Sequence, residues 1–204
     1  DRTGTRYQKL QKLRMMMGRG RRGGGPPIYL IFMAMRYLPR LMEEKPAVTL
    51  VCLNAIQEEI GGHGAMMATY RIKPEMCLCL DVTHATDTPG IDPAKFGLVK
   101  LGEGPTLTHG TCNHPLIVKR LIDVSEKGKI NIQHESSSRF SGTDTDKIFT
   151  SREGVPSALV SLPLRCMHSV VETAHLDDIE ATIKLLEEFV LSVKDTETFH
   201  QSLD

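Results

Sequence analysis

The chain has 204 residues, which is enough for one large domain or two small ones, and its 40% hydrophobic and 25% charged content is that of an ordinary globular protein. Its 25 basic residues balance 25 acidic ones, so the net charge is zero and the sequence predicts neither nucleic acid nor an acidic membrane as a partner. The chain has five cysteines, an odd number that favours a cytoplasmic protein without a disulfide framework. It has no apolar run of about 20 residues, so we do not expect it to span a membrane.

The first 27 residues differ in composition from the rest. Residues 1–25 contain eight lysines and arginines against one acidic residue, Asp1, and they have no sustained apolar period. We interpret residues 1–27 as a basic segment that is irregular or foreign to the fold, and residues 28–204 as the folded domain. A basic arm that binds RNA or a membrane is the alternative, although Tyr7 is the one aromatic residue among the cations.

From residue 28 onward, apolar runs of helix length alternate with runs of strand length, as in an α/β domain. The spacing predicts helices over residues 28–44, 63–71, 113–127 and 176–193. It predicts strands over residues 47–56, 76–82, 97–101, 130–134 and 156–162. The run at 47–56 is continuously apolar, so we expect a central strand covered on both faces. Asn113, two residues before Pro115, is the expected cap of the third helix.

Acidic and imidazole side chains follow three of the predicted strands. Glu58 and Glu59 come after the first strand, Asp81 ends the second, and Arg165 and His168 come after the last. In an open α/β sheet the ligand crevice lies beyond the carboxyl ends of the strands. Carboxylate and imidazole groups bind Zn²⁺ or Co²⁺, and in a carboxylate pair one group can bind metal while the other takes a proton from the attacking water. A solvated loop around Glu58 and Glu59 is the alternative that these residues leave open.

The remaining polar residues favour structural roles. The histidines expected in loops, at the surface or at helix caps are His84, His109, His114 and His175. Residues 136–146 form a polar loop that either precedes a helix near residue 147 or lines a pocket. The sequence has no Walker loop, dinucleotide-binding glycine motif or G-x-S-x-G elbow, which argues against phosphoryl transfer and serine hydrolysis.

The sequence QEEIGGHGA at residues 57–65 resembles the Gln-Glu-Glu-x-Gly-x-x-Gly-Ala motif of the glutamyl aminopeptidases and the tetrahedral (TET) deblocking aminopeptidases. Some members of this family carry the older label endoglucanase M. Further matching segments follow in order: DVTH at 81–84, DTPG at 87–90, GP at 104–105, THG at 108–110, SGTD at 141–144, SREGVP at 151–156 and PLRCMHS at 163–169. The resemblance covers residues 28–195.

This resemblance implies a three-layer α/β sandwich of the zinc-exopeptidase (phosphorylase/hydrolase-like) type, with a mostly parallel central sheet that is incomplete at its N-terminus. Family members release N-terminal residues from peptides with two divalent metal ions, Zn²⁺ or Co²⁺, held by five side chains. Such paired ions polarise the scissile carbonyl and activate water. The family also implies a cytoplasmic homo-oligomer, from a dimer to a dodecamer.

The same resemblance implies a role for individual residues. Glu58 corresponds to the general base, Glu59 and His168 to ligands of one metal ion, and Asp81 to a ligand of the second. Residues that the resemblance assigns to substrate binding are Gly142, Thr143 and Arg165.

Before residue 28 the chain departs from the family pattern. The upstream His-x-Asp motif, the inserted β-rich domain and the bridging aspartate have no counterpart, and one alignment places Arg19 where the bridging ligand belongs. We therefore expect a truncated or ligand-deficient form of the enzyme that binds one metal ion or none. The alternative is a non-catalytic relative that acts in assembly or peptide binding. A glycosidase is disfavoured, because its two carboxylates stand at least about 5 Å apart on opposite sides of a bond.

Overall fold

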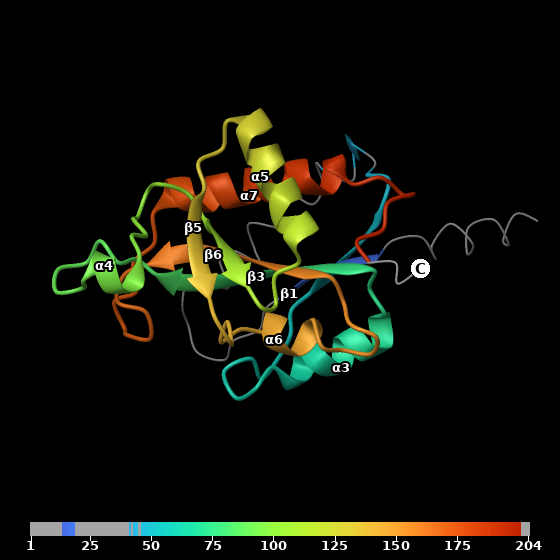
Figure 1. Cartoon of the computed structure of the whole chain (residues 1–204), viewed down its shortest axis with the longest axis horizontal. Coiled ribbons are helices and arrows are strands. Elements are labelled where there is room, and N and C mark those ends of the chain that lie inside the picture. Colours follow the sequence, from blue (N-terminus) through green and yellow to red (C-terminus); the bar gives the residue numbers. More distant parts are fainter. Residues whose placement is uncertain (1–13, 19–40, 42, 45, 201–204) are drawn as a thin grey trace, which may run out of the picture.

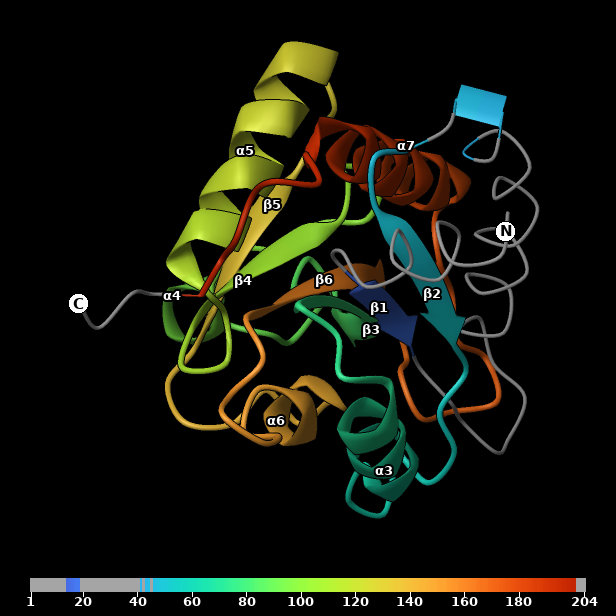
Figure 2. The same cartoon turned by 90° about the vertical axis from the view of Figure 1, so that its right-hand side faces the viewer.

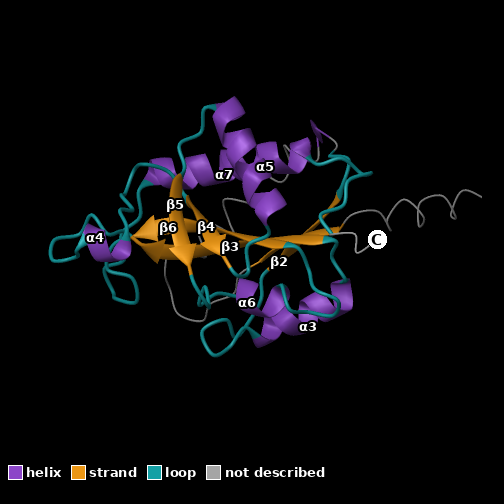
Figure 3. Cartoon of the chain, viewed as in Figure 1, coloured by secondary structure: helices purple, strands orange, loops and turns teal. Residues whose placement is uncertain are grey.

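The computed structural model describes residues 14–18, 41, 43–44 and 46–200. The helices that lie wholly within the described residues are α3 (His63–Ile72), α4 (Pro93–Phe96), α5 (Pro115–Gly128), α6 (Thr145–Ile148) and α7 (Leu176–Ser192). A sheet forms the middle layer, with α5 and α7 on one face and α3 and α6 on the other (Figures 1 and 3). This arrangement confirms the predicted three-layer α/β fold. No helix in the described part of the chain is long and apolar enough to cross a membrane.

The sheet has six strands in the order β2-β1-β3-β6-β4-β5. The strands are β1 (Arg14–Gly18), β2 (Thr49–Leu53), β3 (Met76–His84), β4 (Thr106–Gly110), β5 (Gln133–Ser137) and β6 (Ser157–Leu164). Neighbouring strands are parallel except for β4 and β6, which are antiparallel, so the predicted mostly parallel sheet is confirmed. In Figure 1 both β4 and β5 run steeply across the direction of β3 and β6.

The core lies on both sides of β3 and β6, whose side chains are nearly all buried. The larger cluster packs the sheet against α5 and α7, which lie side by side in Figure 2. On α5 the buried residues follow helical spacing: Ile117, Leu121 and Val124 face the sheet. A smaller cluster, which includes Ala65 of α3 and Ile148 of α6, covers the other face. The two central strands are therefore fixed from both sides.

Strand β1 lies within the segment that we predicted to be irregular. Its residues pair in parallel with β2 and with β3, and Gly18 is in register with both Leu53 and Cys79. For Arg14–Gly18 the prediction of an irregular segment is therefore wrong. Three consecutive methionines suit a strand in the middle of a sheet, although the glycines and cations around them hide the pattern. The division of the chain at residue 27 stays a prediction.

Other predicted elements differ in extent. The helix expected at 28–44 falls outside the described residues except for 41, 43 and 44. The expected strand 47–56 is shorter and is the outermost described strand at its end of the sheet, with mostly half-buried side chains rather than a fully covered position. No strand forms at 97–101, where Val99 is instead tied to Thr86 by hydrogen bonds of 2.7 and 2.8 Å. Strand β4 was not predicted.

The start of α5 also differs from the prediction. His114, rather than Asn113, occupies the cap position, and its side chain makes no capping hydrogen bond. The Asn113 amide oxygen instead accepts a 2.6 Å hydrogen bond from the backbone N–H of Leu159 in β6. A buried side chain thus ties the start of the helix to the central sheet.

Candidate active site

A tight turn after β2 carries the two neighbouring carboxylates. The backbone N–H of Gly62 donates to the carbonyl oxygens of Gln57 (2.9 Å) and Glu58 (3.1 Å), which closes the turn. Gly62 has φ 65°, and a Cβ atom added there would lie 2.9 Å from the side chain of Lys147, so the turn requires glycine. Within the turn, Glu58 is buried with 8% of its surface exposed, whereas Glu59 is exposed.

His168 reaches this turn from a loop that follows β6. Backbone hydrogen bonds of 3.0 and 3.1 Å between Arg165 and Thr173 close the loop. The backbone N–H of His168 donates to Glu172 Oε1 at 2.7 Å. His168 Nε2 then lies 3.8 Å from Glu59 Oε2, although 109 positions separate the two residues in the sequence. The structure therefore brings together the two residues that the resemblance assigns to one metal ion.

Asp81 lies on β3, with 4% of its surface exposed. Its Oδ1 accepts a 2.6 Å hydrogen bond from the backbone N–H of Val82. Because β1 stands between β2 and β3 and all three are parallel, Asp81 and the Glu58–Glu59 turn belong to the same edge of the sheet but are separated by one strand. In the described part of the chain no three His, Cys, Asp or Glu side chains are grouped closely enough to hold a metal ion.

The pair formed by Glu59 and His168 fits two ligands of one divalent ion. Zinc lies about 2.0–2.2 Å from carboxylate oxygen or imidazole nitrogen, so two ligands of one ion are at most about 4.3 Å apart. The observed 3.8 Å is within this limit. Both side chains are accessible, with 38% of Glu59 and 57% of His168 exposed. The donor set is thus suited to one metal ion, while Asp81 stands apart from it.

The predicted substrate-binding residues take different positions. Thr143 lines a cavity of about 330 Å³ on the α3 and α6 side of the sheet. Gly142 lies in the preceding loop, where its N–H donates to Asp146 Oδ2 at 2.9 Å. Arg165 is paired with Asp87, with an Nη2–Oδ2 distance of 2.6 Å, and this pairing raises the pKa of Arg165. Binding of substrate by these three residues stays a prediction.

Glu135 on β5 was not recognised from the sequence, yet it lines the same cavity. Its two carboxylate oxygens accept hydrogen bonds from Thr83 on β3 (2.7 Å) and Thr108 on β4 (2.6 Å). Residue 135 falls one position beyond the strand predicted at 130–134, and residues 136–138 are serines. The only sequence signal for this cavity was the polar loop at 136–146. Of its two predicted roles, lining a pocket is confirmed.

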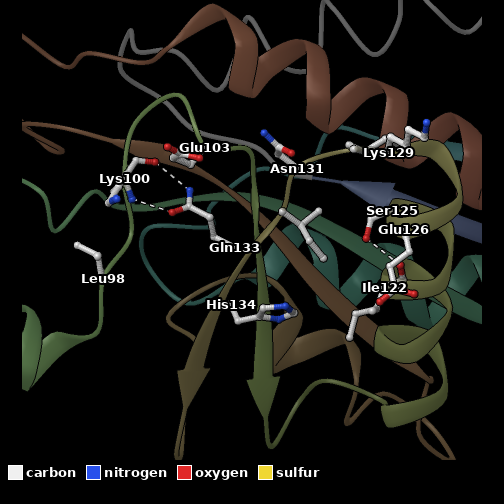
Figure 4. A pocket seen from close by; sticks show the side chains of 12 residues that line it. Leu98, Lys100, Glu103, Ile122, Ser125, Glu126, Lys129, Asn131, Gln133 and His134 are labelled. Carbon is white, nitrogen blue, oxygen red and sulfur yellow. Dashed lines mark hydrogen bonds between the residues drawn. The ribbon is translucent and has the colours of Figure 1, made fainter.

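A larger cavity of about 640 Å³ lies between the C-terminal half of α5, β5 and the loop at 98–103 (Figure 4). None of the predicted site residues lines it. His134 does, and its Nδ1 lies 2.9 Å from His109 Nε2. Burial and the neighbouring His109 lower the pKa of His134. His175, which the sequence led us to expect at the surface or in a hydrogen bond, is the cap of α7, where its Nδ1 accepts from the backbone N–H of Asp177.

Comparisons with known proteins place these features in context. A family model described as M42 glutamyl aminopeptidase matches residues 29–185. The lysyl aminopeptidase of Pyrococcus furiosus is 38% identical over 140 residues, which are 69% of this chain and 40% of that protein. The crystal structure of a TET aminopeptidase from a marine sediment Thaumarchaeota archaeon has a TM-score of 0.74 and 29% identity, covering 81% of this chain and 46% of that one.

A third relative, the TET1 peptidase of Pyrococcus horikoshii, can assemble into a tetrahedron or a large octahedral shell. It has a TM-score of 0.66 and 24% identity, and the match covers 81% of this chain and 47% of that one. The chain described here spans less than half the length of each of these three proteins.

Proposed function

Because the chain belongs to the M42 glutamyl aminopeptidase family, we propose that it forms part of a metal-dependent aminopeptidase, which removes N-terminal residues from peptides. The observation that carries this proposal is the approach of Glu59 and His168 to 3.8 Å. These residues come from two loops that are remote in sequence, and the buried carboxylate of Glu58 directly precedes Glu59 in the chain.

In this proposal Glu59 and His168 hold one divalent ion, Zn²⁺ or Co²⁺. When bound, the ion would polarise the scissile carbonyl and lower the pKa of water. Glu58 accepts the proton of the attacking water on its carboxylate and then passes it to the amine of the leaving peptide. Burial suits this role, because it shields the carboxylate from bulk water and strengthens its interactions with nearby charge.

Asp81 is proposed to bind a second ion. Support comes from its position at the same sheet edge as Glu59, one strand away across β1. Backbone strain bears on the first ion rather than on Asp81, because it occurs at His168 and near Glu59. Gln57 has φ 63° and His168 has φ 65°, conformations that are costly for residues other than glycine and that gather at functional sites.

The remaining proposals concern partners and location. We infer that the substrates are peptides and that the chain forms a homo-oligomer, since the TET1 peptidase of Pyrococcus horikoshii assembles into shells. A cytoplasmic location is favoured because no disulfide joins the five cysteines, all of which lie in the described part of the chain.

A second candidate function is peptide binding or assembly without turnover. It is favoured by the sequence that follows β1, the strand between β2 and β3. There the chain continues from Gly18 into Arg19, Arg21 and Arg22. Arginine side chains are not metal ligands, and positive charge near a metal site opposes the binding of divalent ions.

Substitution of the proposed base separates the two candidates. Glu58→Gln keeps the size of the side chain but removes its basicity, so we expect unchanged Zn²⁺ binding and a loss of turnover of about 10²–10⁴-fold. Turnover is measured as release of free amino acids from a short peptide at saturating Zn²⁺ or Co²⁺. Glu153→Gln, which alters an exposed carboxylate away from the site, is the matched control. Equal turnover in Glu58→Gln and Glu153→Gln would reject Glu58 as the base, and a wild-type chain without turnover would favour the second candidate.

A further inference from the structure

Two exposed histidines lie in contact on the last two strands of the sheet. His109 Nε2 on β4 is 2.9 Å from His134 Nδ1 on β5, and the centroids of the two rings are 5.1 Å apart. At this distance one of the facing nitrogens donates its hydrogen and the other accepts it, so the two rings are not both protonated at the contact. The contact therefore contains a nitrogen lone pair, which is the group that binds a metal ion.

The pairing of the two strands holds the histidines together. β4 and β5 are parallel, and Leu107 is the register partner of His134. Side chains two positions apart on a strand share a face, so His109 lies on the same face as Leu107 and His134. Leu107 is fully buried in the core cluster on the α5 and α7 side of the sheet, which anchors this face. On the other face Thr108 donates to Glu135 at 2.6 Å, so contacts on both faces fix the register of β4 and β5.

The separation of the two nitrogens fits two neighbouring ligands of one ion with square or tetragonal coordination. With metal–nitrogen bonds of about 2.0–2.1 Å, two nitrogens at a right angle are about 2.8–3.0 Å apart, whereas at a tetrahedral angle they are about 3.3–3.4 Å apart. The observed 2.9 Å matches the right angle. Tetragonal coordination by nitrogen is typical of Cu²⁺ and Ni²⁺, and Cu²⁺ binds most tightly among the divalent first-row ions. Zn²⁺, which prefers tetrahedral angles, fits the pair less well.

Binding of an ion between the neutral rings needs a change of tautomer but no net loss of a proton. A neutral imidazole has one N–H and one lone pair. The ring that donates in the hydrogen bond must therefore carry its hydrogen on its other nitrogen before both lone pairs can face the ion. Because His109 and His134 are both exposed, exchange with water can move this hydrogen, and the rings can rotate toward a shared ion.

The charges around the pair do not oppose a cation. His134 lines the cavity of about 640 Å³ together with two lysines and two glutamates, whose charges balance. In Figure 4 His134 and Ile122 lie at one end of this cavity, whereas Lys100 and Lys129 lie toward the other. Among the described residues no third His, Cys, Asp or Glu is grouped with the pair closely enough to be a ligand, so water would complete the coordination.

We propose that His109 and His134 form a binding site for a Cu²⁺ ion, which joins the last two strands of the sheet. The site is separate from the candidate active site, because β6 stands between β4 and β3, the strand that carries Asp81, and β1 and β2 lie beyond β3. The proposal rests on the geometry of the two imidazoles alone and does not depend on the proposed aminopeptidase function. Its preference for tetragonal ions also distinguishes it from a site for Zn²⁺.

The test titrates Cu²⁺ into the His168→Gln chain, which lacks the imidazole of the candidate active site, and records calorimetry and electron paramagnetic resonance. We expect hyperfine coupling from two nitrogens. Adding His134→Gln should leave one coupled nitrogen and weaken binding at least about tenfold, since even loss of a hydrogen-bond partner outside the ligand set costs that much at metal sites. Adding His84→Gln instead, which alters an exposed histidine at the end of β3, should change neither.

A measurement on the wild-type chain covers the case in which a variant does not fold. Diethyl pyrocarbonate modifies exposed imidazoles, and mass spectrometry locates the modified residues. Cu²⁺ should protect His109 and His134 from modification and leave His84 as reactive as before. Equal Cu²⁺ affinity with and without His134→Gln, a spectrum with fewer than two coupled nitrogens in the His168→Gln chain, or no protection of His109 and His134 would overturn the proposal.

Discussion

Asp178 clamps the loop that leads into β4, and its removal provides a quantitative test of the fold around the candidate sites. The side chain is fully buried in the first turn of α7. Its Oδ2 accepts from the backbone N–H of Gly102 at 2.8 Å, and its Oδ1 accepts from that of Gly104 at 2.7 Å. Through this contact the last helix fixes the start of the strand that carries Thr108.

The expected loss of stability on removal of the Asp178 side chain follows from these contacts. A hydrogen bond to a charged group contributes about 1.5–3 kcal/mol, and a carboxylate in the first turn of a helix adds about 0.3–1 kcal/mol. Asp178→Ala removes two such bonds and leaves two backbone N–H groups without their acceptor, while it relieves the cost of burying the charge. We expect the free energy of unfolding to fall by about 3–5 kcal/mol.

The assay is urea unfolding at pH 7, followed by circular dichroism. Asp177→Ala is the matched control, because Asp177 occupies the same turn but its side chain is 77% exposed. The control loses about 0.3–1 kcal/mol, the contribution of the helix dipole. Amide hydrogen exchange at Gly102 and Gly104 should accelerate in Asp178→Ala and stay unchanged in Asp177→Ala. An equal loss of stability in the two variants would refute the proposed clamp.

Three further predictions concern other parts of the fold. Arg120 lowers the pKa of Glu197 below its ordinary value of 4.5, so their pairing stabilises the fold above that pH and the contribution is lost as the pH falls through the lowered pKa. Arg120→Ala should therefore cost about 1 kcal/mol in urea unfolding at pH 7 and less at pH 3, and an equal cost at both would contradict the pairing. Gly104→Ala should lower the melting temperature by many degrees, because φ is +93° and the added Cβ would lie 2.0 Å from a backbone carbonyl oxygen; an unchanged melting temperature would contradict that contact. In native protein, iodoacetamide should modify the exposed Cys166 and spare the buried Cys79, because a hydrogen bond with the Cys77 thiol and burial raise the pKa of Cys79. Mass spectrometry that finds Cys79 modified as fast as Cys166 would contradict its burial.

The sequence predicted the parts of the fold whose residues carry their own periodic signal. The buried runs of β3 and β6 and the amphipathic α7 lie close to the predicted boundaries. Strand β1 was missed because the apolar residues Met15, Met16 and Met17 are followed by glycines and arginines, and only pairing with β2 and β3 makes them a strand. Tertiary contacts determine the formation of β1, and a short stretch of sequence does not reveal such contacts.

The structure bears differently on the separate parts of the candidate site. Glu59 and His168 were assigned together from motifs 109 positions apart, and the structure places them 3.8 Å from each other. Glu135 was missed because its partners, Thr83 and Thr108, come from two other strands. Thr108 is the register partner of Glu135 on the neighbouring strand, and β3, which carries Thr83, is separated from β5 by two strands, so no local spacing in the sequence connects these residues. Motif resemblance thus paired Glu59 with His168, whose roles as metal ligands stay a prediction, whereas the contacts of Glu135 required the three-dimensional structure.

The metal content of three purified proteins tests the central claim most directly. The wild-type chain, Glu59→Gln and His168→Gln are purified without chelator, dialysed against Zn²⁺ or Co²⁺ and analysed by elemental mass spectrometry. We predict about one divalent ion per wild-type chain, because Asp81, which belongs to no group of three possible ligands in the described part of the chain, would hold a second ion only weakly. We predict close to none in either variant, because each variant removes one of the two ligands of the first ion. Equal metal content in all three proteins, or none in the wild type, would contradict the assignment of Glu59 and His168 as the metal-binding pair.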